Sequence, residues 1–320
     1  MSSGNILLEC RDLRKYFNTP NGKLHAVDDV SFRLEEGKTL GVVGESGCGK
    51  STLGRTILRL HPHTSGEVLF RGRNILEISK KDMLPLRREM QMIFQDPFSS
   101  LDPRKTVSQA IEEPLIIHRL FKSRAAREAR VAELMDIVGL DYRYVNTYPH
   151  ELDGGRRQRI GIARALATNP KFIVCDEPVS ALDVSIQAQV LNLMMDLKES
   201  MGLTYMFITH DLSVVKHISD EIMVLYLGKM VEKAEPDELF ANPLHPYTKA
   251  LLSAIPVPDV SYKGKEAEVM KGEVTSPINP PQGCRFAARC PFACDKCHTE
   301  YPEYREIKPG HFVACHFVEA

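Results

Sequence analysis

A glycine-rich loop directly after an apolar segment constrains this chain more than any other feature of its sequence. Residues 39–43, T-L-G-V-V, have the pattern of a short buried strand, and residues 44–51 are G-E-S-G-C-G-K-S. A strand followed by G-x-x-x-x-G-K-S and a helix is typical of phosphate loops, whose backbone N–H groups converge on phosphate oxygens. The loop therefore predicts a nucleoside triphosphate site made by Gly44, Glu45, Ser46, Gly47, Cys48, Gly49, Lys50, Ser51 and Thr52.

Two adjacent carboxylates at the end of a second apolar segment supply the chemistry that such a loop needs. Residues 171–178 are K-F-I-V-C-D-E-P, a buried-strand pattern that ends in Asp176 and Glu177. In phosphate-loop hydrolases the lysine, Lys50, meets the β- and γ-phosphates, while Ser51 and Asp176 hold Mg²⁺. Glu177 is then placed to polarise the attacking water as a general base. Without the loop a solvated turn is the better interpretation, and with it the pair predicts catalysis.

Four further segments complete an ordered series. Gln95 lies in I-F-Q-D-P, residues 152–159 are L-D-G-G-R-R-Q-R, residues 180–183 are S-A-L-D, and His210 follows F-I-T. Over about residues 6–255 this series resembles the ATP-binding subunits of ABC transporters. The resemblance implies an α/β fold, the ABC-type nucleotide-binding domain, with a RecA-like core, an antiparallel β subdomain and an inserted helical subdomain. It also implies ATP and Mg²⁺ as ligands.

The resemblance implies a role for individual residues. Gln95 would sense Mg²⁺ and the attacking water and couple to a membrane partner, Asp183 would lie at a dimer contact, and His210 would contact the γ-phosphate. Taken alone, each has a plainer interpretation as a polar loop residue, a helix cap or a satisfied strand-end histidine. Adenine stacks on an aromatic face, and in register with the family Phe17 supplies it. A core Phe17 beside a surface Tyr16 is the alternative.

The segment at 152–156 departs from the family, whose pattern there is L-S-G-G-Q. Gly154 and Gly155 are kept, but Asp153 replaces the serine and Arg156 the glutamine. In the family this loop points at the γ-phosphate bound by the partner subunit. A carboxylate about 4 Å from a phosphate charge is repelled by about 4 kcal/mol at an effective dielectric of 20. Asp153 is still a good helix cap, and Arg156 could pair with it or reach the phosphate, so we expect a weakened site.

This departure predicts an asymmetric dimer. In the family two ATP-binding subunits sandwich two ATP molecules, each between the phosphate loop of one chain and the signature of the other. This chain keeps its loop, Asp176, Glu177 and His210. It should therefore form one competent site with a partner's intact signature and lend its altered signature to the other site. A homologous but different ATPase is the expected partner.

The resemblance implies an ABC ATPase domain at residues 1–255 and leaves a C-terminal extension at 256–320. Within the first, about residues 96–165 show almost no strand pattern and predict the helical subdomain. The clearest helical segments are 125–138 and 157–166, and the clearest strands are 204–208 and 221–226. With 43% apolar and 26% charged residues and a net charge of −1, the composition indicates a globular protein without a broad basic surface for nucleic acid.

Membrane attachment is expected to be indirect. No segment approaches the ~18 uninterrupted apolar residues of a spanning helix, and the N-terminal residues lack a signal-peptide pattern. Residues 242–252, N-P-L-H-P-Y-T-K-A-L-L, resemble the C-terminal signature of oligopeptide and dipeptide importer ATPases. The close members of that branch import peptides, nickel or sugar oligomers.

Five of the eight cysteines follow residue 283, which predicts a metal centre in a cytosolic chain. Cys284, Cys290, Cys297 and Cys315 resemble the four-cysteine iron–sulfur motif of many such ATPases, leaving Cys294 as an extra thiol. Four thiolates hold either a 4Fe–4S cluster or one Zn²⁺, and free thiols are a third possibility. Histidines nearby are interpreted as surface residues or as supports for the ligands: His298, His311 and His316.

Two other cysteines adjoin the nucleotide motifs. Cys48 lies in the phosphate loop and Cys175 precedes Asp176. A redox brake at Cys48 would need a lowered thiol pKa, as a helix N-terminus can provide. Small loop filler for Cys48 and strand core for Cys175 are the plainer interpretations.

These observations predict an ATPase subunit of a peptide importer at the cytoplasmic face of the membrane. It would act with a homologous ATPase, two transmembrane permeases and, indirectly, an extracytoplasmic substrate-binding protein. A soluble ABC ATPase of DNA repair or translation is an alternative, but such proteins usually carry coiled-coil insertions or two cassettes. A metal-responsive regulatory subunit is another, and the intact Glu177 argues against it.

Overall fold

The computed structural model describes residues 5–255 and 276–318. The chain forms two compact units. Unit 1 comprises Met1–Asn5, Glu35–Lys38 and Glu77–Ile208, and unit 2 comprises Ile6–Leu34, Thr39–Leu76 and Thr209–Ala320. The phosphate loop belongs to unit 2, whereas Asp176 and Glu177 belong to unit 1. The boundary expected after residue 255 adjoins residues 256–275, which lie outside the described part of the chain.

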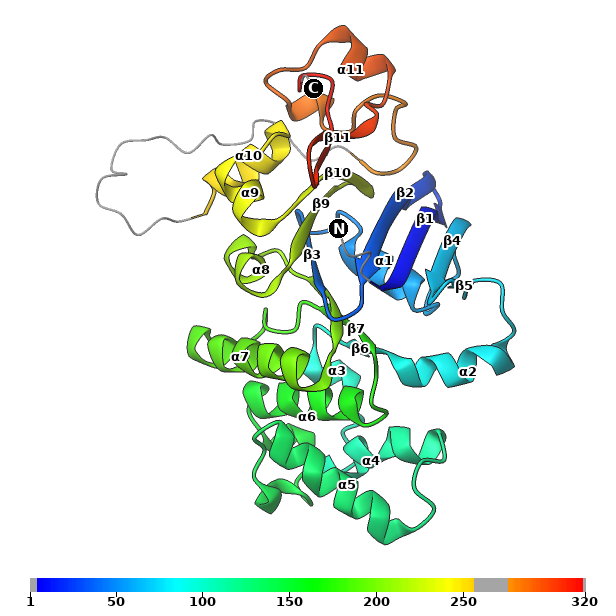
Figure 1. Cartoon of the computed structure of the whole chain (residues 1–320), viewed down its shortest axis with the longest axis vertical. Coiled ribbons are helices and arrows are strands. Elements are labelled where there is room, and N and C mark those ends of the chain that lie inside the picture. Colours follow the sequence, from blue (N-terminus) through cyan, green and yellow to red (C-terminus); the bar gives the residue numbers. More distant parts are fainter. Residues whose placement is uncertain (1–4, 256–275, 319–320) are drawn as a thin grey trace, which may run out of the picture. The chain divides into compact units, whose positions relative to one another are not determined.

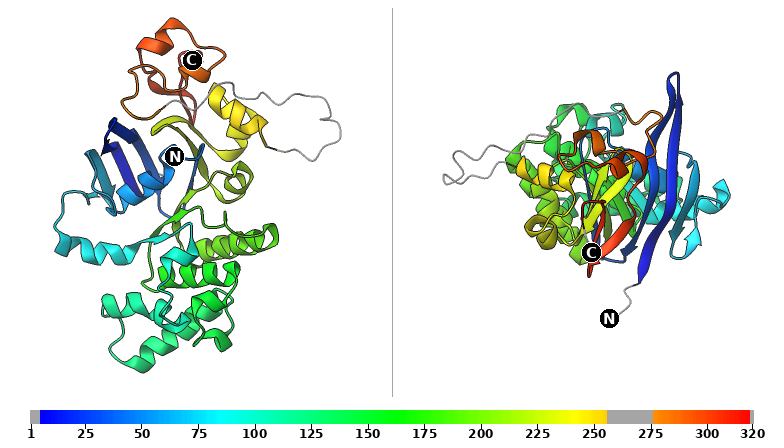
Figure 2. Two further views of the ribbon diagram at one scale, coloured as in Figure 1. Left: turned by 180° about the vertical axis from the view of Figure 1, so that it is seen from behind. Right: turned by 90° about the horizontal axis from the view of Figure 1, so that it is seen from above.

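The first sheet of unit 2 is antiparallel and has the order β2-β1-β4-β5. Its strands are β1 (Ile6–Thr19), β2 (Gly22–Glu35), β4 (Ser65–Phe70) and β5 (Arg73–Asn74). The two long strands β1 and β2 are dark blue in Figure 2. Along β2, buried Val30, Phe32 and Leu34 alternate with exposed residues, as expected for a strand with one face in the core. This sheet is the antiparallel β subdomain that the resemblance implies.

The second group of strands in unit 2 has the order β11-β12-β10-β9-β3. It contains β3 (Thr39–Val43), β9 (Glu221–Tyr226), β10 (Lys229–Ala234), β11 (Tyr304–Lys308) and β12 (His311–Ala314). β3 pairs in parallel with β9, and the other pairs are antiparallel. Because β12 pairs with β10, the C-terminal residues continue the sheet that carries the phosphate loop.

Short helices connect these strands in unit 2. They are α1 (Lys50–Ile57), α8 (Leu212–Ile218), α9 (Pro236–Ala241), α10 (Pro246–Ser253) and α11 (Asp295–Thr299), with a 3-10 turn at Ala287–Arg289. Prolines begin α9 and α10, where the missing N–H costs nothing. Helix α1 follows the phosphate loop directly, as the motif predicted.

Unit 1 combines three parallel strands with helices. The strands are β6 (Met90–Ile93), β7 (Phe172–Asp176) and β8 (Thr204–Ile208), in the order β8-β7-β6. β7 and β8 are buried along their whole length, which explains their continuous apolar sequences. The helices are α2 (Lys80–Glu89), α3 (Pro97–Ser100), α4 (Val107–Ile117), α5 (Arg124–Ile137), α6 (Gly154–Leu166) and α7 (Val184–Met201). Helices α4, α5 and α6 pack on one another (Figure 1).

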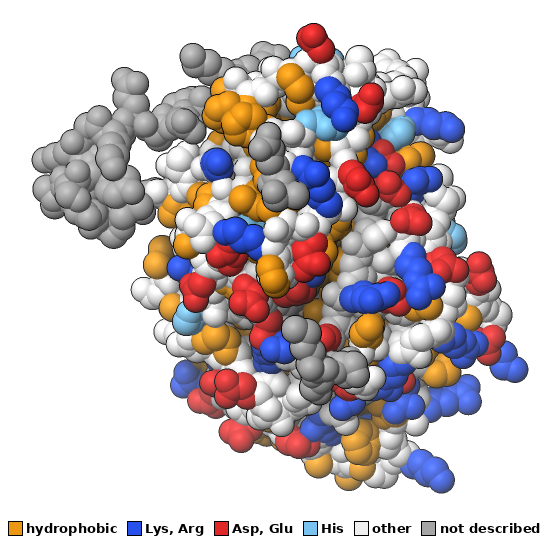
Figure 3. Space-filling model, turned by 45° about the horizontal axis from the view of Figure 1, so that its top comes forward, with side chains coloured by type: hydrophobic (Ala, Val, Ile, Leu, Met, Phe, Trp, Pro, Cys, Tyr) orange, Lys and Arg blue, Asp and Glu red, His pale blue; other side chains and the backbone are white. Residues whose placement is uncertain are grey.

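The predicted elements agree with these bounds. The strands expected at 204–208 and 221–226 are β8 and β9, and the helices expected at 125–138 and 157–166 lie within or beside α5 and α6. Short 3-10 turns at Tyr142–Tyr144 and Pro149–Glu151 complete the segment before α6. Within the described part of the chain no helix is both long and apolar enough to cross a membrane. Side chains of both charges are interspersed over the face shown in Figure 3.

Candidate nucleotide site and family

The phosphate loop is a tight backbone turn that requires glycine at particular positions. Gly49 caps α1 with φ 106°, and a Cβ there would lie 1.9 Å from the Ala26 carbonyl oxygen. Gly44 has φ 150°, and its Cβ would lie 2.2 Å from the carbonyl oxygen of Leu225. Gly47 has φ 78° and open space beside its Cα. Gly49 and Gly44 therefore allow neighbouring backbone to approach closely. Gly47 is required only for its left-handed backbone conformation.

Lys50 is held inside this loop. Its side chain is buried, with 4% of the residue exposed. The Nζ ammonium donates to the carbonyl oxygens of Gly44 at 2.7 Å and Glu45 at 3.0 Å. These contacts keep the charge within the turn whose N–H groups surround a bound phosphate. The structure thus places Lys50 where the motif predicted.

Two residues that sequence reasoning missed support the loop from outside. Glu45 donates its backbone N–H to the Tyr247 hydroxyl oxygen at 2.8 Å, and Gly228 donates its N–H to the Cys48 carbonyl at 2.7 Å. Tyr247 is fully buried and lies in the segment that resembles the importer C-terminal signature. That resemblance was the available signal, although it said nothing of a contact with the loop.

Cys48 and Cys175 have the plainer roles. Cys48 is 2% exposed and Cys175 is fully buried. Burial raises the pKa of the Cys48 thiol, outweighing the nearby Lys50 charge, and burial raises the pKa of Cys175 well above its usual value. The low pKa that a redox brake at Cys48 would require is therefore absent.

In unit 1 the predicted catalytic carboxylates lie at the end of β7, where Asp176 is the last residue of the strand and Glu177 follows it. Asp176 is fully buried, and Glu177 has the left-handed backbone φ of 46°. The Glu177 N–H donates to the Ile208 carbonyl at 2.9 Å, which fixes this turn against β8. Gln95, just beyond β6, donates its Nε2–H to the Glu177 carboxylate at 2.8 Å. The structure therefore brings the predicted base and the predicted water-sensing glutamine into direct contact.

His210 belongs to unit 2 and is exposed. The preceding residue, Thr209, donates its backbone N–H to the Val42 carbonyl oxygen at 3.2 Å, so this turn is attached to the strand that leads into the phosphate loop. Asp211 accepts N–H groups of Ser213 and Val214 and caps α8. His210 is thus held between a strand contact and a helix cap, and its contact with a γ-phosphate stays a prediction.

The two candidate aromatic residues for adenine differ in their surroundings. Tyr16 stacks on His25 with ring centroids 3.9 Å apart and donates its hydroxyl to Asp28 at 2.5 Å. Phe17 is half-buried, meets His61 edge-on at 5.7 Å and has the Lys15 ammonium 4.3 Å from its ring centroid. Because the Tyr16 ring is already stacked, Phe17 remains the predicted adenine contact.

The altered signature forms a helix cap closed by an ion pair. Asp153 accepts the Arg156 N–H at 2.8 Å and also pairs with the Arg156 guanidinium. Both interpretations offered for this pair, a cap and a neutralising partner, are therefore present. A Cβ on Gly155 would lie 2.6 Å from Ile186, whose N–H donates to Asp183 at 3.0 Å. Asp183 caps α7, so the plainer interpretation of that residue also holds, and its dimer contact stays a prediction.

Comparisons with known proteins agree with this geometry. A family described as ABC transporter matches residues 27–180, and one described as the oligopeptide/dipeptide transporter C-terminal region matches residues 231–297. The chain is 54% identical over 319 residues to the oligopeptide transport ATP-binding protein AppF of Bacillus subtilis (strain 168), covering 97% of each chain. It is 54% identical over 310 residues to OppF of the same organism, covering 97% of this chain and 96% of that one.

The chain belongs to the ATP-binding subunits of ABC transporters, in the oligopeptide transport branch. A solved ATP-binding cassette, in a dimeric post-hydrolysis state bound to ADP and Pi, matches with 30% identity and a TM-score of 0.66. The match covers 72% of this chain and 98% of that cassette. The predicted family and ATPase activity are confirmed.

The cysteines at the C-terminal end of this ABC ATPase lie near one another. Burial raises the pKa of Cys284 to about 11, and the charges of Cys297, Cys315 and Cys290 add to the rise. Cys294, interpreted from the sequence as the extra thiol, has its Sγ 3.6 Å from that of Cys297. Yet nowhere in residues 5–255 and 276–318 do three His, Cys, Asp or Glu side chains form a group that could hold a metal ion. The structure therefore does not support the expected iron–sulfur site.

One histidine of this region, His311, differs from the surface role expected for it. His311 is fully buried, and its Nε2 lies 2.8 Å from Glu232, a carboxylate that is also fully buried. Burial opposes protonation, but hydrogen bonds to Glu232 and Glu238 raise the pKa of His311. His311 thus joins β12 to β10 and is not a surface residue. His298 is exposed, as expected, and His316 is half-buried.

Proposed function

We propose that this subunit hydrolyses ATP at the cytoplasmic face of the membrane to import peptides through two permease subunits. The observation that carries the proposal is the 2.8 Å hydrogen bond between Gln95 and Glu177 in a chain that also keeps an intact phosphate loop. Glu177, the proposed general base, thus contacts Gln95. Gln95 lies between β6 and the turn-rich start of the helical region. Relatives named oligopeptide transport ATP-binding proteins support the cargo class.

The altered signature supports pairing with a different ATPase. Asp153 and Arg156 neutralise each other, so the signature loop presents an ion pair instead of a serine hydroxyl. A homodimer would place this ion pair in both ATP sites. A heterodimer keeps one site with an intact signature, and an extracytoplasmic binding protein would deliver the cargo to the permeases.

The test of cargo uses the complex reconstituted in lipid vesicles with its partner ATPase, permeases and binding protein. We expect ATP-dependent uptake of a labelled oligopeptide. Uptake should be lost in the Lys50→Ala variant, since the lysine is buried within the phosphate loop. Uptake of nickel or of a sugar oligomer, with no uptake of peptides, would contradict the proposed cargo.

We propose further that the C-terminal thiols bind an iron–sulfur cluster, with zinc as the competing occupant. Four thiolates are the usual ligands of such a cluster, and Cys290, Cys297 and Cys315 lie near enough to Cys284 for their charges to raise its pKa. A bound cluster would tie these four segments of chain together. Cys294, whose Sγ lies 3.6 Å from that of Cys297, stays outside the predicted set.

Metal content distinguishes these occupants. Protein purified without oxygen should be brown and contain iron and sulfide, and Cys290→Ser should remove the colour. Cys294→Ser is the matched control, since it removes an exposed thiol outside the predicted set and should leave the iron content unchanged. Colourless protein with one zinc per chain would select zinc, and metal-free protein would reject the centre.

A further inference from the structure

A short segment near the C-terminal end contacts both the phosphate loop and strand β2. The segment, Cys284–Cys290, has the sequence C-R-F-A-A-R-C and is called the basic strap below. It carries two arginines, Arg285 and Arg289, whose side chains are 5% and 6% exposed. Guanidinium groups buried to this degree need partners. All the partners described below lie in unit 2, as the strap does.

The phosphate loop supplies the partner of Arg289. Its two terminal nitrogens lie 2.8 and 3.0 Å from the two carboxylate oxygens of Glu45, a bidentate ion pair. The hydrogen bonds that Arg289 donates to Glu45 and Tyr226 raise its pKa, so it stays charged. Glu45 also donates its backbone N–H to Tyr247. Residue 45 is therefore held by its side chain and by its backbone.

The other arginine, Arg285, contacts strand β2 and the turn between β9 and β10. Arg285 donates to the Leu227 carbonyl and pairs with Asp28. Asp28 in turn accepts the Tyr16 hydroxyl at 2.5 Å. Burial opposes ionisation of Asp28, but the hydrogen bond from Tyr16 and the charges of Lys229 and Arg285 lower its pKa. The strap thus contacts β2, whose Asp28 bonds to Tyr16 on β1, as well as the phosphate loop.

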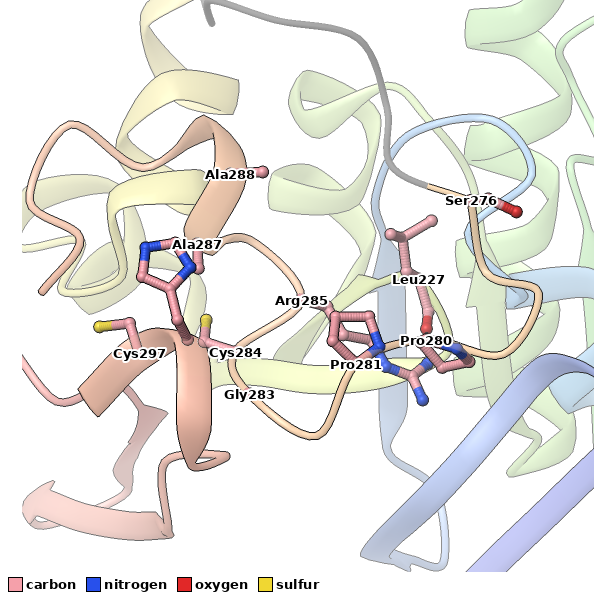
Figure 4. Close-up of a pocket in the computed structure, with 11 residues that line it drawn as sticks. Leu227, Ser276, Pro280, Pro281, Gly283, Cys284, Arg285, Ala287, Ala288 and Cys297 are labelled. Atoms are coloured by element: carbon pink, nitrogen blue, oxygen red, sulfur yellow. The ribbon is translucent and has the colours of Figure 1, made fainter. Parts of the chain in front are cut away.

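The strap is fixed in position by the residue between its arginines. Phe286 is 2% exposed and packs edge-on against Tyr226, with centroids 5.2 Å apart, and against Tyr247 at 5.4 Å. At the strap's first residue, the Cys284 N–H donates to the Cys297 carbonyl at 2.7 Å. Figure 4 shows the sulfur atoms of Cys284 and Cys297 on one side of the strap and Arg285 directed to the other, around a cavity of about 110 Å³.

We propose that Arg289 is a positioning residue for ATP binding, which holds Glu45 and with it the phosphate loop in the shape that accepts a triphosphate. Glu45 is the second residue of the loop, so its carboxylate lies beside the place where phosphate charge arrives. Paired with Arg289, this carboxylate is neutralised. Without the arginine, an unpaired carboxylate would repel the phosphates and free the loop to move.

The test measures steady-state ATP hydrolysis by the full complex, with KM and kcat determined separately. Arg289→Gln should raise KM for ATP about tenfold, as expected when one member of a largely buried ion pair is removed, while kcat changes less than about twofold. Arg289→Lys should recover part of the loss, because lysine keeps the charge but not the bidentate geometry. Lys296→Gln is the control, since Lys296 forms only an exposed ion pair with Glu300 on α11.

A double-mutant cycle separates positioning from general stability. In a Glu45→Gln background, Arg289→Gln should raise KM less than about threefold, because the carboxylate that needed neutralising is gone. A merely structural arginine would lower the melting temperature equally in both backgrounds and leave KM alone. An unchanged KM in Arg289→Gln, or full additivity of the two substitutions in KM, would overturn the proposal.

Discussion

Glu177→Gln is expected to bind MgATP normally but to hydrolyse it about 100-fold more slowly or worse, so that the ATPase dimer remains closed. The carboxylate follows β7 and accepts the Gln95 amide at 2.8 Å. A glutamine fits this position but cannot accept a proton from the attacking water. The substitution leaves the phosphate loop, residues 44–51, unchanged, so ATP binding should be unaffected. Phosphate release by the assembled complex measures the loss, and retention of labelled ATP measures the trapped state.

The matched control for that variant is Glu199→Gln. Glu199 is an exposed carboxylate on α7, so the substitution removes one charge from unit 1 without touching the predicted base. Its turnover should equal that of the unmodified complex. If Glu177→Gln retained near-normal hydrolysis, the assignment of Glu177 as the base would be wrong.

The second large effect concerns the two unequal ATP sites. Lys50→Ala should remove most of the ATPase activity of the heterodimer, because it disables the site expected to have all its parts. Conversely, Asp153→Ser with Arg156→Gln should raise turnover at the partner's phosphate loop, since a hydroxyl then replaces an ion pair at the helix cap. The site built on Lys50 should be nearly unchanged.

Arg156→Gln alone tests the physical basis of this difference. Asp153 would keep its capping bond to the residue 156 N–H, but its charge would lose the guanidinium. Turnover at the partner's site should then fall below that of the unmodified complex, because the uncompensated carboxylate repels the γ-phosphate. Steady-state ATP hydrolysis by the complex with its partner ATPase measures this fall in turnover.

The same measurement tests Lys50→Ala. If that variant kept most of its activity, the altered signature would be competent as it stands.

Local patterns predicted several of the strands and helices and the positions of the nucleotide motifs on them, whereas the fold was predicted from the resemblance to a known family. The loop at 44–51 and the carboxylates at 176–177 depend on a strand and the few residues that follow it, so their sequence and geometry are directly linked. The same holds for Asp153, whose capping bond spans three residues. Hydrophobic spacing likewise located β8 and β9 to the residue.

Contacts between distant parts of the chain could not be predicted in this way. Tyr247 and Arg289 reach Glu45 across 202 and 244 positions, and no periodicity of either segment indicates the partner. The burial of His311 against Glu232 was missed for a similar reason, because histidine near a cysteine cluster is equally consistent with a surface role. The three-dimensional packing within unit 2 is needed to reveal these pairs.

Unit 2 is built from segments that lie far apart in the sequence, and this affects how it folds during synthesis. Its first strand begins at Ile6 and its last ends at Ala314, and Lys23 donates its backbone N–H to Asn279, 256 positions away. The Lys23–Asn279 contact can form only after residue 279 has been synthesised, and contacts this far apart in the sequence form slowly. A chain that stops early would carry the complete phosphate-loop motif without Arg289 to hold it. On the proposal for Arg289, such a chain would bind ATP weakly.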